Sequence, residues 1–132
     1  MTQDFVPIVE QLFTAWGKDW EGFLQSYRDY LAPDGVYIAH PNVPPTTGAD
    51  AAIAVLEPFH GMGVESIDVE IVKIVQVGND VWTERIDYMK NGSGERYLSI
   101  PIGGVFTFSD DGKITRWADY WDMQQVVATA GG

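Results

Sequence analysis

The chain has 132 residues, no cysteine and a formal net charge of −11 at pH 7. The lack of thiols excludes disulfides, thiolate metal sites and cysteine nucleophiles, and the negative charge disfavours nucleic acid, anionic membrane surfaces and polyanionic substrates as partners. Without a basic leader, an apolar run of membrane-spanning length or a break in composition, we expect one cytoplasmic domain over residues 1–132.

Two helices are predicted at the start of the chain. Apolar residues recur at helical spacing over residues 5–16, where Gly17 ends the run. The same spacing returns over residues 20–31, up to a turn at Pro33 and Gly35. We expect the two helices to pack against each other through these apolar faces.

A strand, a loop and a third helix are predicted next. Residues 35–40 form the short strand. Residues 41–48 predict a loop, because they are rich in proline, which cannot donate to a hydrogen-bond ladder. The third helix covers residues 49–59, and a Gly-Met-Gly turn follows it.

The rest of the chain predicts strands joined by tight turns rich in Gly, Asn and Asp. Their ranges are 67–77, 81–89, 96–108 and 114–123. Sequential hairpins favour an antiparallel sheet, so three N-terminal helices would cover the concave face of a curved sheet in an α+β domain that encloses a pocket. Gly103 and Gly104 predict a bulge or bend in the third of these strands, and the residues after Val127 predict a frayed tail.

Charged residues lie on the apolar faces of two predicted strands. Because side chains alternate along a strand, Arg85 and Asp87 share a face with Met89, and Asp119 shares one with Trp117. Three buried charges cost several kcal/mol per ion unless they pair. One arginine cannot neutralise two aspartates, so the set favours a shared proton, which makes one carboxyl an acid beside a basic carboxylate. The alternative is a structural salt bridge, with the second carboxylate facing solvent.

The acid requires a strongly perturbed pKa. A usable acid at pH 7 needs a pKa near 7 instead of the ordinary ~3.9, a difference of roughly 4 kcal/mol. Apolar burial and a neighbouring carboxylate raise the pKa, whereas Arg85 lowers it. We therefore expect Arg85 to orient both carboxyls while the pair keeps one negative charge.

Tyr37 on the short strand and His40 at the mouth of the proline-rich loop are further candidates for the site. Tyr37 is equally consistent with a core residue. The only histidines, His40 and His60, have no metal-ligand spacing to a carboxylate, so neither a metal site nor a cofactor is predicted.

Aromatic and methionine side chains around the charged set predict an apolar pocket. Its expected lining is Trp20, Phe23, Tyr27, Met89, Trp117, Trp121 and Met123. Such a lining suits a small, neutral, apolar substrate. We also expect a homodimer, because the open sheet would otherwise expose an apolar row that includes Ile100 and Ile102.

Three segments resemble the limonene-1,2-epoxide hydrolases: Thr83-Glu-Arg-Ile-Asp87, Pro101-Ile-Gly-Gly-Val-Phe106 and Asp111-Gly-Lys-Ile-Thr-Arg-Trp-Ala-Asp-Tyr-Trp-Asp122. The resemblance covers most of the chain, and its specific part is the Arg-x-Asp and Trp-x-Asp pair. That family lies in the SnoaL-like, NTF2-like superfamily, which includes nuclear transport factor 2, ketosteroid isomerase and the polyketide cyclases. The resemblance implies a cone-shaped fold whose curved sheet is mixed but mainly antiparallel.

The same resemblance implies a reaction. In the family, an Asp-Arg-Asp set opens an epoxide in one step, without a cofactor or a covalent intermediate. Transferred to this sequence, Asp87 is the acid, Arg85 the bridge and Asp119 the base that activates water. This assignment agrees with the interpretation of the alternating strands.

One position departs from the family pattern. The family holds its water with a tyrosine and an asparagine two positions later, and here Tyr37 is followed by Ala39. His40 and Asn42 are the candidates to replace the missing amide.

Three functions are therefore compared. The leading hypothesis is hydrolysis of a terpene or aryl epoxide to a diol. If nothing replaces the amide, Asp119 would take its proton from the substrate, which gives an isomerase or a lyase that eliminates water or a small aldehyde from an aromatic alcohol. The third possibility is a binding or assembly module, in which the charged residues form only a structural network.

Overall fold

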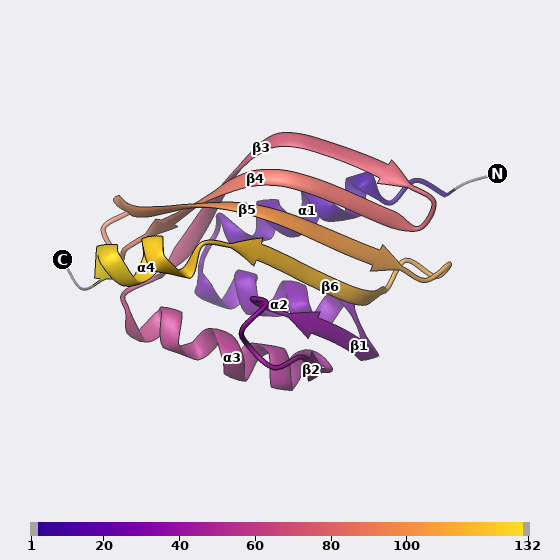
Figure 1. Ribbon diagram of the computed structural model, residues 1–132, viewed down its shortest axis with the longest axis horizontal. Coiled ribbons are helices and arrows are strands. Elements are labelled where there is room, and N and C mark those ends of the chain that lie inside the picture. The colour runs from indigo at the N-terminus through magenta and orange to yellow at the C-terminus, as the bar shows by residue number, and fades with distance from the viewer. Residues whose placement is uncertain (1–2, 131–132) are drawn as a thin grey trace.

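The computed structural model describes residues 3–130, which form an α+β arrangement of helices on a six-stranded sheet (Figure 1). The helices are α1 (Val6–Trp16), α2 (Trp20–Tyr30), α3 (Ala49–Gly61) and α4 (Met123–Ala130). The strands are β1 (Leu31–Ile38), β2 (Thr46–Thr47), β3 (Ser66–Val77), β4 (Asp80–Lys90), β5 (Arg96–Phe108) and β6 (Ile114–Trp121). None of the helices in residues 3–130 has the length and apolar character needed to cross a bilayer.

The sheet is mixed but mainly antiparallel, as the family resemblance implies. Its strand order is β2-β1-β6-β5-β4-β3. The strands from β3 to β6 pair antiparallel in sequence order, as hairpins require. β1 then pairs in parallel with β6, with Tyr37 opposite Trp117. This pairing places the first long strand directly beside the last.

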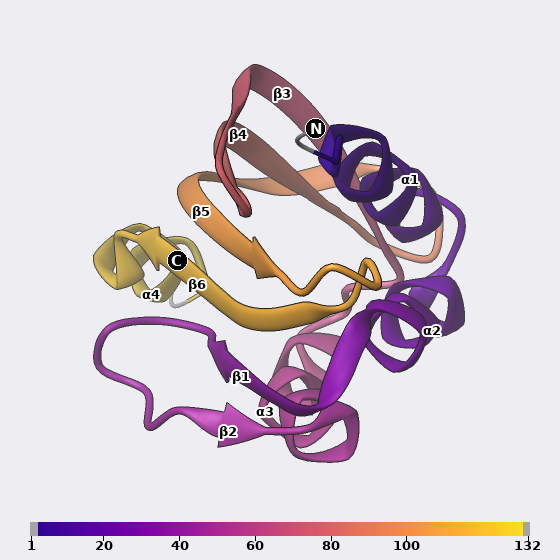
Figure 2. The same cartoon turned by 90° about the vertical axis from the view of Figure 1, so that its right-hand side faces the viewer.

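Helices α1 and α2 lie against the concave face of the curled sheet, and α3 lies near β1 and β2 (Figure 2). The helical repeat buries one face of α1, including Phe13 and Trp16. Asp19 caps α2 by accepting a hydrogen bond of 2.6 Å from the backbone N–H of Gly22. The core therefore lies between these helices and the inner face of the sheet.

The region between α2 and α3 differs from its predicted boundaries. Helix α2 ends at Tyr30 and β1 begins at once at Leu31, before Pro33. The register of β1 against β6 shifts between Leu31 and Val36, so Pro33 lies where no ladder hydrogen bond is required. The predicted loop contains the short strand β2, which pairs antiparallel with β1.

The end of the chain also differs from the prediction. Strand β6 stops at Trp121 instead of continuing to Met123, and α4 follows. The Asp122 carboxylate accepts a hydrogen bond of 2.9 Å from Gln124 N, which satisfies a donor at the start of this helix. Helix α4 runs to Ala130, so part of the predicted frayed tail is helical, and residues 131–132 lie outside the described residues.

Strand β5 has no bulge at its glycine pair, and its predicted apolar row is not exposed. Gly103 and Gly104 pair in continuous register with Glu84 and Thr83, without a bulge between them. Ile100 and Ile102 are buried on the inner face, and their exposed fractions are 2% and 7%. They therefore belong to the core side of the sheet and expose no apolar row to a partner.

Candidate active site

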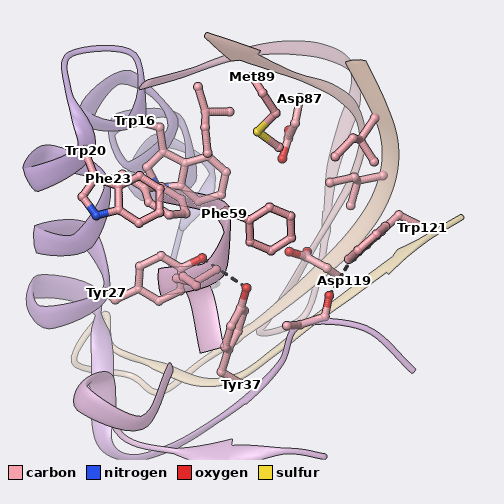
Figure 3. A pocket seen from close by; sticks show the side chains of 15 residues that line it. Trp16, Trp20, Phe23, Tyr27, Tyr37, Phe59, Asp87, Met89, Asp119 and Trp121 are labelled. Atoms are coloured by element: carbon pink, nitrogen blue, oxygen red, sulfur yellow. Dashed lines mark hydrogen bonds between the residues drawn. The ribbon is translucent and has the colours of Figure 1, made fainter. Parts of the chain in front are cut away.

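An apolar cavity opens between the helices and the inner face of the sheet (Figure 3). Its volume is about 50 Å³, so the cavity is narrow. Its lining comes from α1, α2, α3 and all strands except β2, and consists of Trp16, Trp20, Phe23, Tyr27, Tyr37, Ala39, Leu56, Phe59, Ile67, Asp87, Met89, Ile100, Ile102, Asp119 and Trp121.

Arg85 joins two carboxylates beside this cavity. Its Nε donates to Asp87 Oδ1 at 3.0 Å, and its Nη2 donates to Asp119 Oδ2 at 3.2 Å. The side chains of Arg85, Asp87 and Asp119 are 0%, 5% and 7% exposed, so all three are withdrawn from water. With both carboxylates ionised the cluster has a net charge of −1, and one added proton makes it neutral.

Thr83 and two aromatic rings also hold the guanidinium of Arg85 in place. Its Nη1 donates to Thr83 Oγ1 at 3.2 Å, and Thr83 Oγ1 donates to the carbonyl oxygen of Gly104 at 3.1 Å. The Arg85 Cζ atom lies 5.1 Å from the ring centroid of Phe13 and 5.7 Å from that of Trp16. These ring faces attract the cation and fix the plane in which it presents its donors.

The two carboxylates have different hydrogen-bond partners. Within residues 3–130, Asp119 accepts from Arg85 and also from the indole Nε1 of Trp117, which donates to Asp119 Oδ1 at 3.2 Å. Among the residues that the structure describes, Asp87 accepts a side-chain hydrogen bond only from Arg85. A carboxylate with a donor on each oxygen is stabilised as an anion, so the shared proton is favoured on Asp87.

Burial raises the pKa of Asp87 to about 6. The Arg85 charge lowers this pKa, and the Asp119 charge raises it. Burial alone lowers the pKa of Arg85, but the charges of Asp119 and Asp87 raise it above its ordinary value, so the guanidinium stays charged. At pH 7 roughly one Asp87 in ten carries a proton, which is about a hundred times more than for an ordinary aspartate.

Two tyrosine hydroxyls meet at the wall of the cavity. Tyr27 from α2 donates to the hydroxyl of Tyr37 from β1 at 3.3 Å (Figure 3). The Tyr27 ring stacks on Trp117 at 4.6 Å, and the Tyr37 ring packs edge-on against Trp117 at 5.2 Å. Burial raises the pKa of both hydroxyls, so both keep their protons near neutral pH.

The structure does not bring His40 or Asn42 to the cavity wall. The Nε2 of His40 lies 3.1 Å from the carbonyl oxygen of Trp121, and its Nδ1 accepts from the backbone N–H of Asn42 at 3.0 Å. Both ring nitrogens are therefore used within the protein, and the Asn42 side chain is exposed. Ala39 lines the cavity instead.

Most of the predicted lining residues face the cavity: Trp20, Phe23, Tyr27, Met89 and Trp121. Trp117 and Met123 do not belong to the lining. The rings of Tyr27 and Tyr37 cover Trp117, and Met123 leaves the alternating face because it begins α4.

Sequence reasoning did not identify Gly104 and Thr83 as parts of the site, nor Trp117 as a hydrogen-bond donor. A Cβ atom on Gly104 would overlap Arg85 Nη1 and lie 2.7 Å from Asp119 Oδ1, so only glycine leaves room for the pair. Thr83 and Trp117 each precede an identified residue by two positions, which is the strand repeat that could have indicated them.

The comparison with known proteins agrees with this architecture. A structure of an LEH-like epoxide hydrolase from M. tuberculosis is 26% identical, with a TM-score of 0.70 over 98% of this chain and 90% of that one. A protein described as a SnoaL-like polyketide cyclase from Jannaschia sp. CCS1 is 21% identical, with a TM-score of 0.76 over 97% and 92%. An NTF2-like protein of unknown function from Burkholderia pseudomallei K96243 is 14% identical, with a TM-score of 0.78 over 98% and 99%.

The family assignment rests on a sequence match as well as on the fold. No curated protein matches the chain. Residues 9–117, which include β1, β4, β5 and the start of β6, match the SnoaL-like domain. The chain therefore belongs to the SnoaL-like domain family and has the NTF2-like fold.

Proposed function

We propose that this protein is a cofactor-independent epoxide hydrolase that converts an apolar epoxide to a diol. The observation that carries the proposal is the unequal pair of buried carboxyls joined by Arg85. Asp119 accepts hydrogen bonds on both oxygens and acts as the base, whereas Asp87 has the raised pKa of an acid. Acid and base thus face one cavity with complementary protonation states.

The reaction proceeds in one step. Asp119 removes a proton from water as the water oxygen forms a bond to one epoxide carbon, and the bond from that carbon to the epoxide oxygen breaks. Asp87 gives its proton to that oxygen, which becomes the second hydroxyl of the diol. Asp119 ends protonated and Asp87 ionised, so a single proton transfer back to Asp87 restores the starting state.

The cavity lining supports an apolar substrate. Its walls are mainly aromatic and aliphatic, and Asp87 and Asp119 are the ionisable carboxyls among them. Such a cavity favours a neutral molecule over an anion, because an anion would lose its hydration beside carboxyls and apolar walls that offer it no counter-ion. A terpene or aryl epoxide has this chemistry, and the similarity to the M. tuberculosis LEH-like epoxide hydrolase supports the same class.

The test is incubation with terpene and aryl epoxides in oxygen-18 water, followed by mass spectrometry of the products. The proposal predicts a diol with one labelled oxygen. Asp87→Asn and Asp119→Asn should each lower kcat at least about a hundredfold, the usual scale for acid and base groups. No labelled diol across a broad panel would reject the proposal.

Two further variants separate the site from general effects. Arg85→Lys should lose nearly as much activity, because an ammonium cannot hold two carboxyls as a planar guanidinium does. Asp68→Asn is the matched control, since this carboxylate on β3 pairs with Lys90 and Arg96 outside the cavity. It should keep kcat within about threefold of the unmodified protein.

One observation favours a second candidate function. Ala39 lines the cavity, whereas His40 and Asn42 do not. Neither of these two side chains therefore replaces the missing amide near Asp119. If no other group holds water there, Asp119 takes a proton from the substrate and the protein is an isomerase or a lyase. Its product would carry no oxygen from solvent, which the same mass spectra detect.

The binding-module hypothesis has its own test. If the protein is a binding module, Asp119→Asn would lower the free energy of unfolding, and its function would be measured as ligand affinity instead of turnover. An unchanged melting temperature with lost turnover would reject it.

The homodimer stays a prediction, and the apolar surface available for it is the outer face of the sheet, where Val75, Trp82 and Tyr120 are about half exposed.

A further inference from the structure

The exchange of an amide for Ala39 removes two hydrogen-bonding functions from the cavity. A carboxamide can accept a hydrogen of a bound water and can also donate to it. Asp119, an acceptor only when ionised, can hold one of the two water hydrogens. The second hydrogen and the water oxygen need other partners, or the water will not be fixed for attack.

The hydroxyl pair of Tyr27 and Tyr37 offers both functions. Both residues line the cavity, and their oxygens are 3.3 Å apart (Figure 3). Two hydroxyls contain two protons, and their mutual hydrogen bond uses one of them. When Tyr27 donates to Tyr37, the Tyr37 proton and the lone pairs of Tyr27 remain available. One water can therefore contact both hydroxyls while their mutual hydrogen bond stays in place.

We propose that the hydroxyl of Tyr27, bonded to that of Tyr37, completes the binding site of the attacking water in place of the missing amide. This inference rests on the proposed epoxide hydrolase function. Tyr37 donates to the water oxygen, and the water donates one hydrogen to Asp119 and the other to Tyr27. The remaining lone pair of the water is then directed at the epoxide carbon, and Asp119 takes the proton as the new bond forms.

The rings around Tyr27 hold its side chain in place, and none of these ring contacts involves the hydroxyl. Its ring lies parallel to Trp117 at 4.6 Å and to Trp16 at 6.4 Å, and edge-on to Phe23 at 5.4 Å. A phenylalanine ring would make the same contacts. Burying the Tyr27 hydroxyl costs desolvation free energy. A residue that only packed the core would avoid this cost as phenylalanine. The stack therefore presents a rigid polar group to the cavity.

The test compares Tyr27→Phe with Tyr30→Phe on the same helix, whose exposed hydroxyl is bonded to Gln11. Tyr27→Phe should lower kcat about thirtyfold with KM within threefold, since small misplacements of a reacting group cost up to ~100-fold. The pH above which the rate falls should stay unchanged, because the acid Asp87 is untouched. Tyr30→Phe should keep the unmodified kcat.

A rescue variant tests the equivalence with an amide directly. Ala39→Asn in the Tyr27→Phe background should recover at least tenfold in kcat relative to Tyr27→Phe alone. Ala39→Ser, which also brings an acceptor, is the smaller variant measured beside it. Recovery by either variant supports the inference, and recovery by neither overturns it.

The outcomes separate the two proposals. Labelled diol from the unmodified protein with kcat of Tyr27→Phe within threefold would overturn the water-binding role alone. A Tyr27→Phe loss that appears in KM rather than kcat would also overturn it. No labelled diol from the unmodified protein would overturn both proposals together.

Discussion

Gly104 lies directly beneath the guanidinium of Arg85, at the point where β5 passes between β4 and β6. In the register of the sheet it faces Thr83 on one side and Asp119 on the other. A methyl group there would overlap Arg85 Nη1 and come within 2.7 Å of Asp119 Oδ1. The missing side chain is therefore what allows the ion pair to span three strands.

Gly104→Ala should lower kcat at least about tenfold, because the guanidinium must shift away from both carboxyls. It should also reduce the free energy of unfolding by about 1–3 kcal/mol, the usual cost of overpacking. Gly103→Ala is the matched control, since its Cβ would meet nothing within 4 Å. Kinetics and urea unfolding of both variants provide the measurement, and equal effects at the two positions would contradict this account.

Asp87→Asn should make the protein much less active but more stable above neutral pH. The pKa of Asp87 rises from 3.8 unfolded to about 6 folded, so the folded state binds the proton more tightly. Its contribution to stability is present below pH 4 and is lost as pH rises to 6. The variant should therefore be up to about 3 kcal/mol more stable at pH 8 and equal at pH 4. Urea unfolding at both pH values tests this, and a less stable variant at pH 8 would refute it.

The pH dependence of the rate should report the same group. Because the acid must be protonated, kcat/KM should fall about tenfold per pH unit above pH 6. In Asp87→Asn this limb should vanish, leaving a low rate that is independent of pH between 6 and 8. Initial rates across this range test the assignment. A limb that persists in the variant would assign the acid elsewhere.

Trp117→Phe should weaken the base while preserving the core. The phenyl ring can still stack on Tyr27, but the hydrogen bond from Trp117 Nε1 to Asp119 is lost. We expect kcat to fall about tenfold, because one oxygen of the carboxylate loses its orienting donor. Trp82→Phe on the exposed outer face is the control and should leave kcat unchanged. Equal rates for the two variants would remove Trp117 from the site.

The charged set could be predicted from the sequence because it depends only on the two-residue repeat of a strand. Arg85 and Asp87 share a face in any register, and so do Trp117 and Asp119. The contact of Gly104 with Arg85 depends on how β4 and β5 align, which the repeat does not specify. The sequence therefore predicts the chemistry of the site better than its supporting contacts.

The predictions that failed concern residues whose sequence pattern is compatible with two different structures. The alternation of Ile100 and Ile102 is the same whether they face the core or a partner, and only the register decides. Met123 continues the alternation of β6, yet Asp122 satisfies a helix donor and ends the strand. His40 is polar and near the site, but both of its ring nitrogens form hydrogen bonds with backbone atoms.

Because β1 pairs in parallel with β6, the site is not complete until the last strand has been synthesised. Arg85 and Asp87 leave the ribosome before Asp119, and the strand that carries Tyr37 must wait for β6 before its pairing on that side is complete. Pairing between such distant segments is slow to form, because the intervening chain must first be ordered. A nascent chain that ends before β6 thus has the acid and the bridging arginine but no base.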